Sequence, residues 1–238
     1  TVQGLGWSVD GDVVYSAGND GKIGRWELVE GRSVELHGEG GMSYHSLDVS
    51  ADGMQVVVGG AREVRIFDTR NLNEVALSHS MHTGSVYGVG LSADGTKAVS
   101  CAADNTVRVW DVRGGAELLQ FNPSLGSALD LAYWGGRVAV TGHMDNYGVA
   151  WDVEAGVELY RTGCQAHEAW GVGLSPDESK LFVSDAIAKC VRIHDIAAAS
   201  EIAHKPAVHT GIIWAADWAS NNAFAVTGSG DKTVKVFN

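Results

Sequence analysis

Three residues have the types needed for nucleophilic catalysis. His82, Ser100 and Asp104 could form a Ser-His-Asp triad, in which the imidazole accepts the serine proton and the carboxylate orients the imidazole. A hydrolase also needs an accessible nucleophile and donors for an oxyanion, and the sequence identifies no such donors. We therefore predict that the chain is not an enzyme and keep a hydrolase as the least favoured function.

Nine histidines raise the question of a metal site. The closest pairs are His79 with His82 and His204 with His209, and neither pair has a cysteine or a second pair nearby. Structural zinc sites use three or four converging ligands, so we predict no metal. The run 228–233 resembles a phosphate-binding loop, but no helix follows it. We interpret this run as a turn and predict no cofactor.

The charge balance and the cysteines limit the choice of partner and compartment. There are 17 basic and 29 acidic residues, a net charge of −12, which argues against direct nucleic-acid binding. We interpret the basic residues Arg65, Arg108, Arg192 and Lys235 as solvated strand positions. No apolar stretch approaches 18 residues, so no membrane insertion is expected. Three widely spaced cysteines favour a reducing intracellular compartment.

The elements that must position these residues repeat along the chain. An aromatic residue or histidine, followed in most copies by aspartate, recurs at 26, 67, 110, 151, 194 and 237. Between these positions, short runs of alternating apolar residues are separated by Gly, Asp and Asn turns, which predicts antiparallel strands. Six units with a period near 42 cover residues 1–238, which we predict to be a single domain. The units end near 26–37, 67–79, 110–121, 151–162, 194–204 and 237–238.

Four strands in each unit and a terminal Trp-Asp pair resemble the WD-repeat (WD40) β-propeller family. The expected fold class is all-β, with six units and 23 strands, because the last unit lacks its fourth strand. The resemblance implies that the chain is part of a seven-bladed ring, and a six-unit ring is the alternative.

The resemblance also implies a buried hydrogen-bond relay of His, Ser or Thr, Asp and Trp that stabilises a blade. The third unit has all four residues, the sixth lacks the tryptophan, and the first and fourth lack a matching histidine. In chain order by unit, these residues are Ser16, Asp20 and Trp26; His82, Ser100, Asp104 and Trp110; Thr141, Asp145 and Trp151; and His209, Thr227 and Asp231.

Two units depart further from this relay. The second has Val57 and Ala61 at the serine and aspartate positions. The fifth keeps His167 and Ser184 but has Ala188 at the aspartate position. A partly kept polar network is less stable, so we expect these two blades to be the least rigid.

One position near the start of each first strand is rich in large side chains. In the family this end of the innermost strands opens on the top face of the propeller. The candidate partner-binding residues at this position are Gln3, His45, Tyr87, Trp170 and Trp214, and Met144, in the turn before Asp145, is expected to join them. Exposed aromatic residues are frequent anchors in protein interfaces, although these tryptophans could instead fill gaps between blades.

These observations favour a non-enzymatic scaffold that binds a peptide or loop of a partner protein on its top face within a multi-subunit complex. The alternative is an architectural subunit held through its blade sides, with no top-face ligand. The expected location is the cytoplasm, with the nucleus and cilium left open. The sequence names neither the partner nor the pathway.

Overall fold

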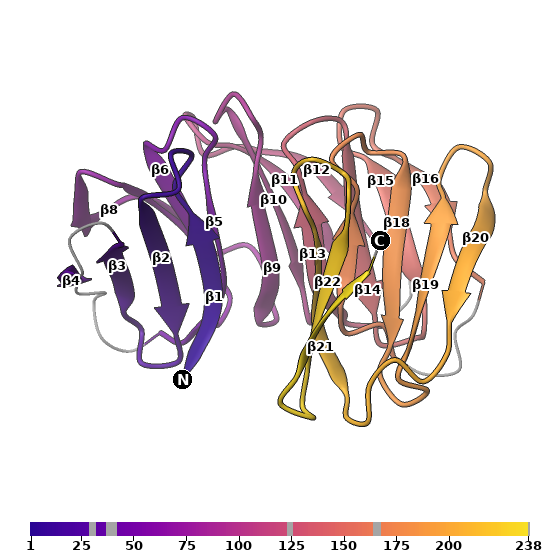
Figure 1. The fold of residues 1–238 in the computed structure, drawn as a ribbon. Coiled ribbons are helices and arrows are strands. Elements are labelled where there is room, and N and C mark those ends of the chain that lie inside the picture. Colours follow the sequence, from indigo (N-terminus) through magenta and orange to yellow (C-terminus); the bar gives the residue numbers. More distant parts are fainter. Residues whose placement is uncertain (29–31, 37–41, 123–125, 164–167, 238) are drawn as a thin grey trace. The chain divides into compact units, whose positions relative to one another are not determined.

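All regular structure in the described residues is β-strand. The computed structural model describes residues 1–28, 32–36, 42–122, 126–163 and 168–237. It contains 23 strands in six antiparallel sheets (Figure 1), which confirms the predicted all-β fold class and strand number. In this part of the chain, no helix is long and apolar enough to span a membrane.

The chain divides into two compact units, and the first comprises residues 1–120. It contains three four-stranded sheets, each with its strands in chain order. The strands are β1 (Val2–Trp7), β2 (Val13–Gly18), β3 (Ile23–Glu27), β4 (Arg32–Leu36), β5 (Tyr44–Val49), β6 (Gln55–Gly60), β7 (Val64–Asp68), β8 (Asn71–His79), β9 (Val86–Leu91), β10 (Lys97–Ala102), β11 (Val107–Asp111) and β12 (Glu117–Phe121).

The second unit comprises residues 121–238 and contains the fourth to sixth sheets. The fourth and fifth sheets have four strands, and the sixth has three. The strands are β13 (Ala128–Tyr133), β14 (Val138–His143), β15 (Gly148–Asp152), β16 (Val157–Arg161), β17 (Val172–Leu174), β18 (Lys180–Asp185), β19 (Cys190–Asp195), β20 (Ser200–Lys205), β21 (Ile213–Trp218), β22 (Ala225–Ser229) and β23 (Val234–Phe237).

A serine-aspartate turn joins the first two strands of four sheets. In the third sheet, Ser92 Oγ donates to Asp94 Oδ1 at 2.7 Å and accepts the Lys97 amide at 2.8 Å. Gly95 in the same turn has a φ of 65°, which glycine adopts without steric cost. The same two side-chain bonds are made by Ser8, Ser50 and Ser175. These turns set the register of each hairpin.

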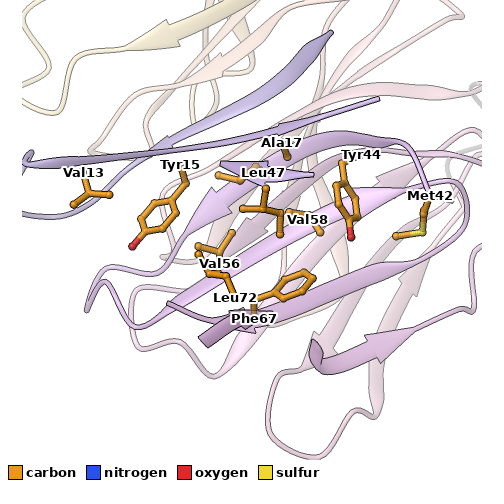
Figure 2. Close-up of a cluster of buried hydrophobic side chains, with 11 residues drawn as sticks. Val13, Tyr15, Ala17, Met42, Tyr44, Leu47, Val56, Val58, Phe67 and Leu72 are labelled. Carbon is orange, nitrogen blue, oxygen red and sulfur yellow. The ribbon is translucent and has the colours of Figure 1, made fainter. Parts of the chain in front are cut away.

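The core lies between sheets (Figure 2). The first sheet places Val13 and Tyr15 against Leu47, Val56 and neighbouring side chains of the second sheet. Similar clusters join the second sheet to the third, the fourth to the fifth, and the fifth to the sixth. At Gly4, a β-carbon would lie 2.6 Å from the Leu47 backbone nitrogen, so the close approach of β1 to β5 requires glycine.

The serine-aspartate turns predict how stability depends on acidity. The hydroxyl groups of Ser92 and Ser175 are the largest cause that lowers the pKa values of Asp94 and Asp177 to about 2. A carboxyl whose folded pKa is depressed stabilises the fold above its unfolded pKa of 3.8, and this stabilisation is lost as pH falls to about 2. The free energy of unfolding, measured by urea titration from pH 5 to 2, should therefore decrease. The free energy of unfolding should decrease less in the Asp94→Asn/Asp177→Asn variant. An identical decrease in the variant and the wild type would show that these two carboxyl groups do not cause the pH dependence.

Candidate functional site

The Ser-His-Asp set of the third sheet forms a buried network. His82 Nε2 lies 2.8 Å from Ser100 Oγ, and His82 Nδ1 lies 2.9 Å from Asp104 Oδ2. Trp110 Nε1 donates to the same serine oxygen at 2.8 Å. Ser100 is fully buried (0% exposed), so a substrate has no access to its hydroxyl. This geometry satisfies polar groups inside the sheet and does not present a nucleophile.

The sixth and first sheets contain shorter versions of this network. His209 lies 2.9 Å from Asp231 Oδ2 and 2.8 Å from Thr227 Oγ1. In the first sheet, Trp26 Nε1 donates to Ser16 Oγ at 2.9 Å. Asp20 of the same sheet accepts the amide of Lys22 in the following turn.

The fourth sheet obtains its imidazole from an unexpected position. His143 Nε2 lies 2.8 Å from Thr141 Oγ1, which also accepts Trp151 Nε1 at 2.8 Å. The histidine lies two residues beyond the threonine on β14, whereas the third and sixth sheets use a histidine that precedes the first strand. Burial lowers the pKa of His143 to about 4. We therefore correct the prediction that this unit has no histidine in its network. Asp145 lies in the turn that follows.

The second and fifth sheets lack the network among the described residues. Ser184 of the fifth sheet accepts the Gly171 amide at 2.9 Å and donates to the carbonyl of the same glycine at 2.9 Å. His194, at the tryptophan position, bonds to the hydroxyl of Tyr160 instead. His167, which the sequence pattern assigned to this network, lies outside the described residues.

Removal of the serine at the centre of the network should cost stability in the third sheet. In Ser100→Ala, the buried donor of Trp110 and the imidazole of His82 lose their partner, which costs about 1–3 kcal/mol. Ser16→Ala is the matched control, because Trp26 is 42% exposed and water can replace the lost bond. Urea unfolding of both variants tests this difference, and an equal loss in the two would contradict it.

Hydrogen exchange tests the expected difference in rigidity between sheets. The amides of β6 and β18 belong to sheets without the network, and those of β10 belong to the sheet with the complete network. We expect lower protection in β6 and β18, because local opening there breaks fewer buried hydrogen bonds. Slower exchange in β6 and β18 than in β10 would contradict the expectation.

Among the described residues, no group of three or more His, Cys, Asp or Glu side chains could hold a metal ion. His79 stacks on Trp110 with ring centroids 4.9 Å apart, and His82 belongs to the buried network. Cys101 and Cys190 are buried and form no disulfide among the described residues, and Cys164 lies outside them.

The recurring arginines of the third strands do not behave as freely solvated charges. Arg108 is buried and pairs with Glu117 at 2.5 Å. Arg192 pairs with Glu201 at 2.8 Å, so in both sheets a carboxylate of the neighbouring strand neutralises the arginine. The interpretation of these positions as solvated is therefore wrong for Arg108. Its guanidinium is not available for a phosphate.

The position predicted to bind a partner coincides with a repeated β-bulge. In the sixth sheet, Ile213 pairs with Ser229 and Ala215 pairs with Gly228, which leaves Trp214 as the extra residue. A bulge redirects a side chain and interrupts pairing, and bulges are frequent beside functional sites. The same irregularity occurs at the start of the innermost strand in five sheets, and its extra residues are Gln3, His45, Tyr87, Leu129 and Trp214.

In the second unit, the structure brings two of the predicted tryptophans together. The ring centroids of Trp170 and Trp214 are 4.8 Å apart with an interplanar angle of 86°. Trp214 is 48% exposed, and Trp170 is half-buried. A β-carbon at Gly171 would lie 3.1 Å from the backbone of Ala215, so glycine permits the close approach of the two segments. The Ser184 hydroxyl fixes the backbone of Gly171 through two hydrogen bonds. Because Gly171 directly follows Trp170, these bonds also position the tryptophan.

Backbone hydrogen bonds place the neighbouring turns at the same end of these sheets. The Ala186 amide donates to the Glu168 carbonyl at 3.1 Å, and the Gly230 amide donates to the Ile212 carbonyl at 2.8 Å. The Met144 amide donates to the Ser127 carbonyl at 3.0 Å in the fourth sheet. Ile187, Ile212 and Met144 are 56%, 36% and 45% exposed, so apolar side chains accompany the tryptophan pair at this end.

In the first unit, the bulged residues form a second aromatic contact. The rings of His45 and Tyr87 have centroids 5.5 Å apart, and both residues are half-buried. Desolvation lowers the pKa of His45, so its imidazole is neutral at pH 7. Gln3 is exposed on β1.

The sequence analysis did not identify aspartates of the innermost strands as residues that link neighbouring sheets. Asp48 Oδ2 accepts the Leu91 amide at 2.8 Å, and Asp130 Oδ2 accepts the Val172 amide at 3.0 Å. Each bond joins the innermost strands of two consecutive sheets. The available signal was an aspartate within the first strand of three units, at 48, 130 and 217.

Comparison with known proteins identifies repeats of one kind. The WD40 family model, described as "WD domain, G-beta repeat", matches residues 74–111 and 201–238. The first segment covers much of β8 to β11, and the second covers β20 to β23 apart from the first residue of β20.

Curated relatives match parts of the chain at moderate identity. The U5 small nuclear ribonucleoprotein 40 kDa protein of Dictyostelium discoideum is 31% identical over 48% of this chain and 32% of its own length. The target of rapamycin complex subunit LST8 of Saccharomyces cerevisiae is 32% identical over 42% of this chain and 34% of its own length. The ribosome biogenesis protein YTM1 of Debaryomyces hansenii is 32% identical over 44% of this chain and 24% of its own length. The matched part of this chain thus spans about a third or less of these relatives.

Proposed function

Because this chain belongs to the WD-repeat (WD40) β-propeller family, we propose that it is a non-enzymatic scaffold within a multi-subunit complex. It binds a peptide or loop of a partner protein at the end of the sheets where the innermost strands begin. This end corresponds to the top face of the propeller. The names of two relatives, a ribonucleoprotein component and a complex subunit, support assembly into a larger complex.

The observation that carries this proposal is the tryptophan pair. Trp214 lies on a bulge that directs its side chain away from the regular ladder, and almost half of its surface is exposed. Tryptophan is enriched among interface residues whose truncation costs 2 kcal/mol or more. Ile187 and Ile212 extend the apolar surface around it.

A second candidate is an architectural subunit held through the sides of its sheets. Apolar side chains on the fourth strands favour it, because they are exposed to solvent. Examples are Leu118, Val157, Leu159 and Ile202, which are 46%, 50%, 41% and 52% exposed.

The partners are proteins and not nucleic acids in this proposal. The net charge is −12, and the arginines at 108 and 192 are paired with carboxylates. An intracellular location fits the buried Cys101 and Cys190, which form no disulfide among the described residues.

Affinity purification with quantitative mass spectrometry tests the tryptophan pair. The bait is compared with Trp170→Ala/Trp214→Ala and with Ile202→Ala, a matched exposed apolar side chain on β20. We expect the tryptophan variant to lose its partners by more than about 10-fold, because a loss of 1.4 kcal/mol weakens binding tenfold. Ile202→Ala should keep its partners.

Circular dichroism and thermal unfolding establish that each variant is folded. If the folded tryptophan variant keeps all partners, the proposed site is wrong. If Ile202→Ala loses them instead, the chain is held through its sheet sides.

A further inference from the structure

The indole N–H groups of this chain differ in whether they find an acceptor within the protein. Those of Trp26, Trp110, Trp134 and Trp151 each donate to a hydroxyl or carbonyl oxygen. The ring of Trp214 contacts the ring of Trp170, but its Nε1 donates to no acceptor among the described residues. Because the Trp214 side chain is 48% exposed, this donor is available to water or to a partner.

A glycine lies beside this free donor. A β-carbon at Gly230 would lie 3.0 Å from Trp214 Nε1, so the indole rests against the turn between β22 and β23. The Gly230 amide donates to the Ile212 carbonyl at 2.8 Å, which fixes this turn beside the start of β21. The position of the Trp214 ring is therefore set by Gly230 and by Trp170.

The two indole rings form an angular apolar surface. Their planes are 86° apart. The Ala186 amide donates to the Glu168 carbonyl at 3.1 Å, which holds the turn with Ile187 against the segment before Trp170. Ile187 and Ile212 are 56% and 36% exposed. A segment that binds here therefore needs compact apolar groups for the rings and a free acceptor for the N–H of Trp214.

Backbone conformations differ in the acceptors that they offer to such a donor. In an α-helix, the carbonyl groups are already bonded to amides four residues ahead. A β-strand would have to pair with β21, and the bulge at Trp214 interrupts the ladder of that strand. A polyproline II segment has no internal hydrogen bonds, so its carbonyl groups are free to accept, and its prolines bring rigid apolar rings at a low cost in entropy.

We propose that Trp170 and Trp214 bind a proline-containing segment of the partner in the polyproline II conformation. A proline ring packs in the angle between the two indoles, and a backbone carbonyl of the segment accepts the Trp214 N–H. The apolar residues that flank the proline contact Ile187 and Ile212. This inference rests on the proposed function and names the kind of segment that the site selects.

Random peptides of twelve residues displayed on phage test the selection. The wild type is compared with Trp170→Ala/Trp214→Ala and with Trp7→Ala, which removes an exposed indole on β1. We expect the peptides that bind the wild type and Trp7→Ala, but not the tryptophan-pair variant, to share a proline. Replacement of this proline by alanine in the best synthetic peptide should weaken binding about 10-fold, because the proline ring is the buried anchor.

Trp214→Phe tests the hydrogen bond, because phenylalanine keeps an aromatic ring and has no N–H. The affinity for the proline peptide should fall about 2- to 10-fold, the range expected for one hydrogen bond. A thioamide scan of the peptide weakens one carbonyl acceptor at a time. At one position, this change should cost affinity for the wild type but not for Trp214→Phe.

Gly230→Ala and Gly228→Ala are a matched pair that tests the placement of the indole. A methyl group at 230 crowds Trp214 Nε1, whereas one at 228 meets nothing within 4 Å. Gly230→Ala should therefore weaken peptide binding more than Gly228→Ala does. Circular dichroism establishes that each variant is folded, and if the tryptophan-pair variant is not, Trp214→Phe and Gly230→Ala take its place.

The outcomes separate the two proposals. Tryptophan-dependent peptides that share no proline, or a proline peptide with equal affinity for the wild type and Trp214→Phe, would overturn the polyproline II assignment and leave the proposed function intact. If no peptide requires the tryptophans, the proposed function fails with it.

Discussion

Each sheet in this chain is too thin to enclose a core, so its apolar side chains are buried only against the face of a neighbouring sheet. Val13 and Tyr15 of the first sheet are covered by the second, and Leu174 of the fifth contributes to a cluster with the fourth. The sheets must therefore approach closely, which is why Gly4 has no room for a side chain.

Dry interfaces between sheets require that buried polar groups find partners inside the protein. Ser100 has this role in the third sheet, since its hydroxyl joins an imidazole to an indole. Serine, histidine and aspartate together also form the catalytic triad of hydrolases. Catalysis needs a substrate to reach the serine hydroxyl, and Ser100 is fully buried. In the fourth sheet, His143 provides the imidazole from a different position, so the physical requirement is met without the same sequence pattern.

The ends of the sheets are where regular pairing stops and side chains become available. The bulge at Trp214 lies at the start of β21, and Gly171, which bonds to Ser184, lies just before β17. Together they bring the indole rings of Trp170 and Trp214 into contact. Asp130 accepts the Val172 amide beside the same strand start. The faces of the sheets hold the fold, and the strand starts carry the side chains through which we propose that a partner binds.

The sequence by itself determined the strands, the turns and the number of sheets, because alternation of apolar residues and turn-forming glycines are local properties. It also marked Trp170 and Trp214 as equivalent positions, because the repeat has a constant period. Only the tertiary structure decided that these two rings touch, that His143 completes a network, and that Asp130 bonds an amide 42 residues away. These contacts depend on the register between strands and on the distance between sheets, and neither quantity is encoded in a single stretch of chain.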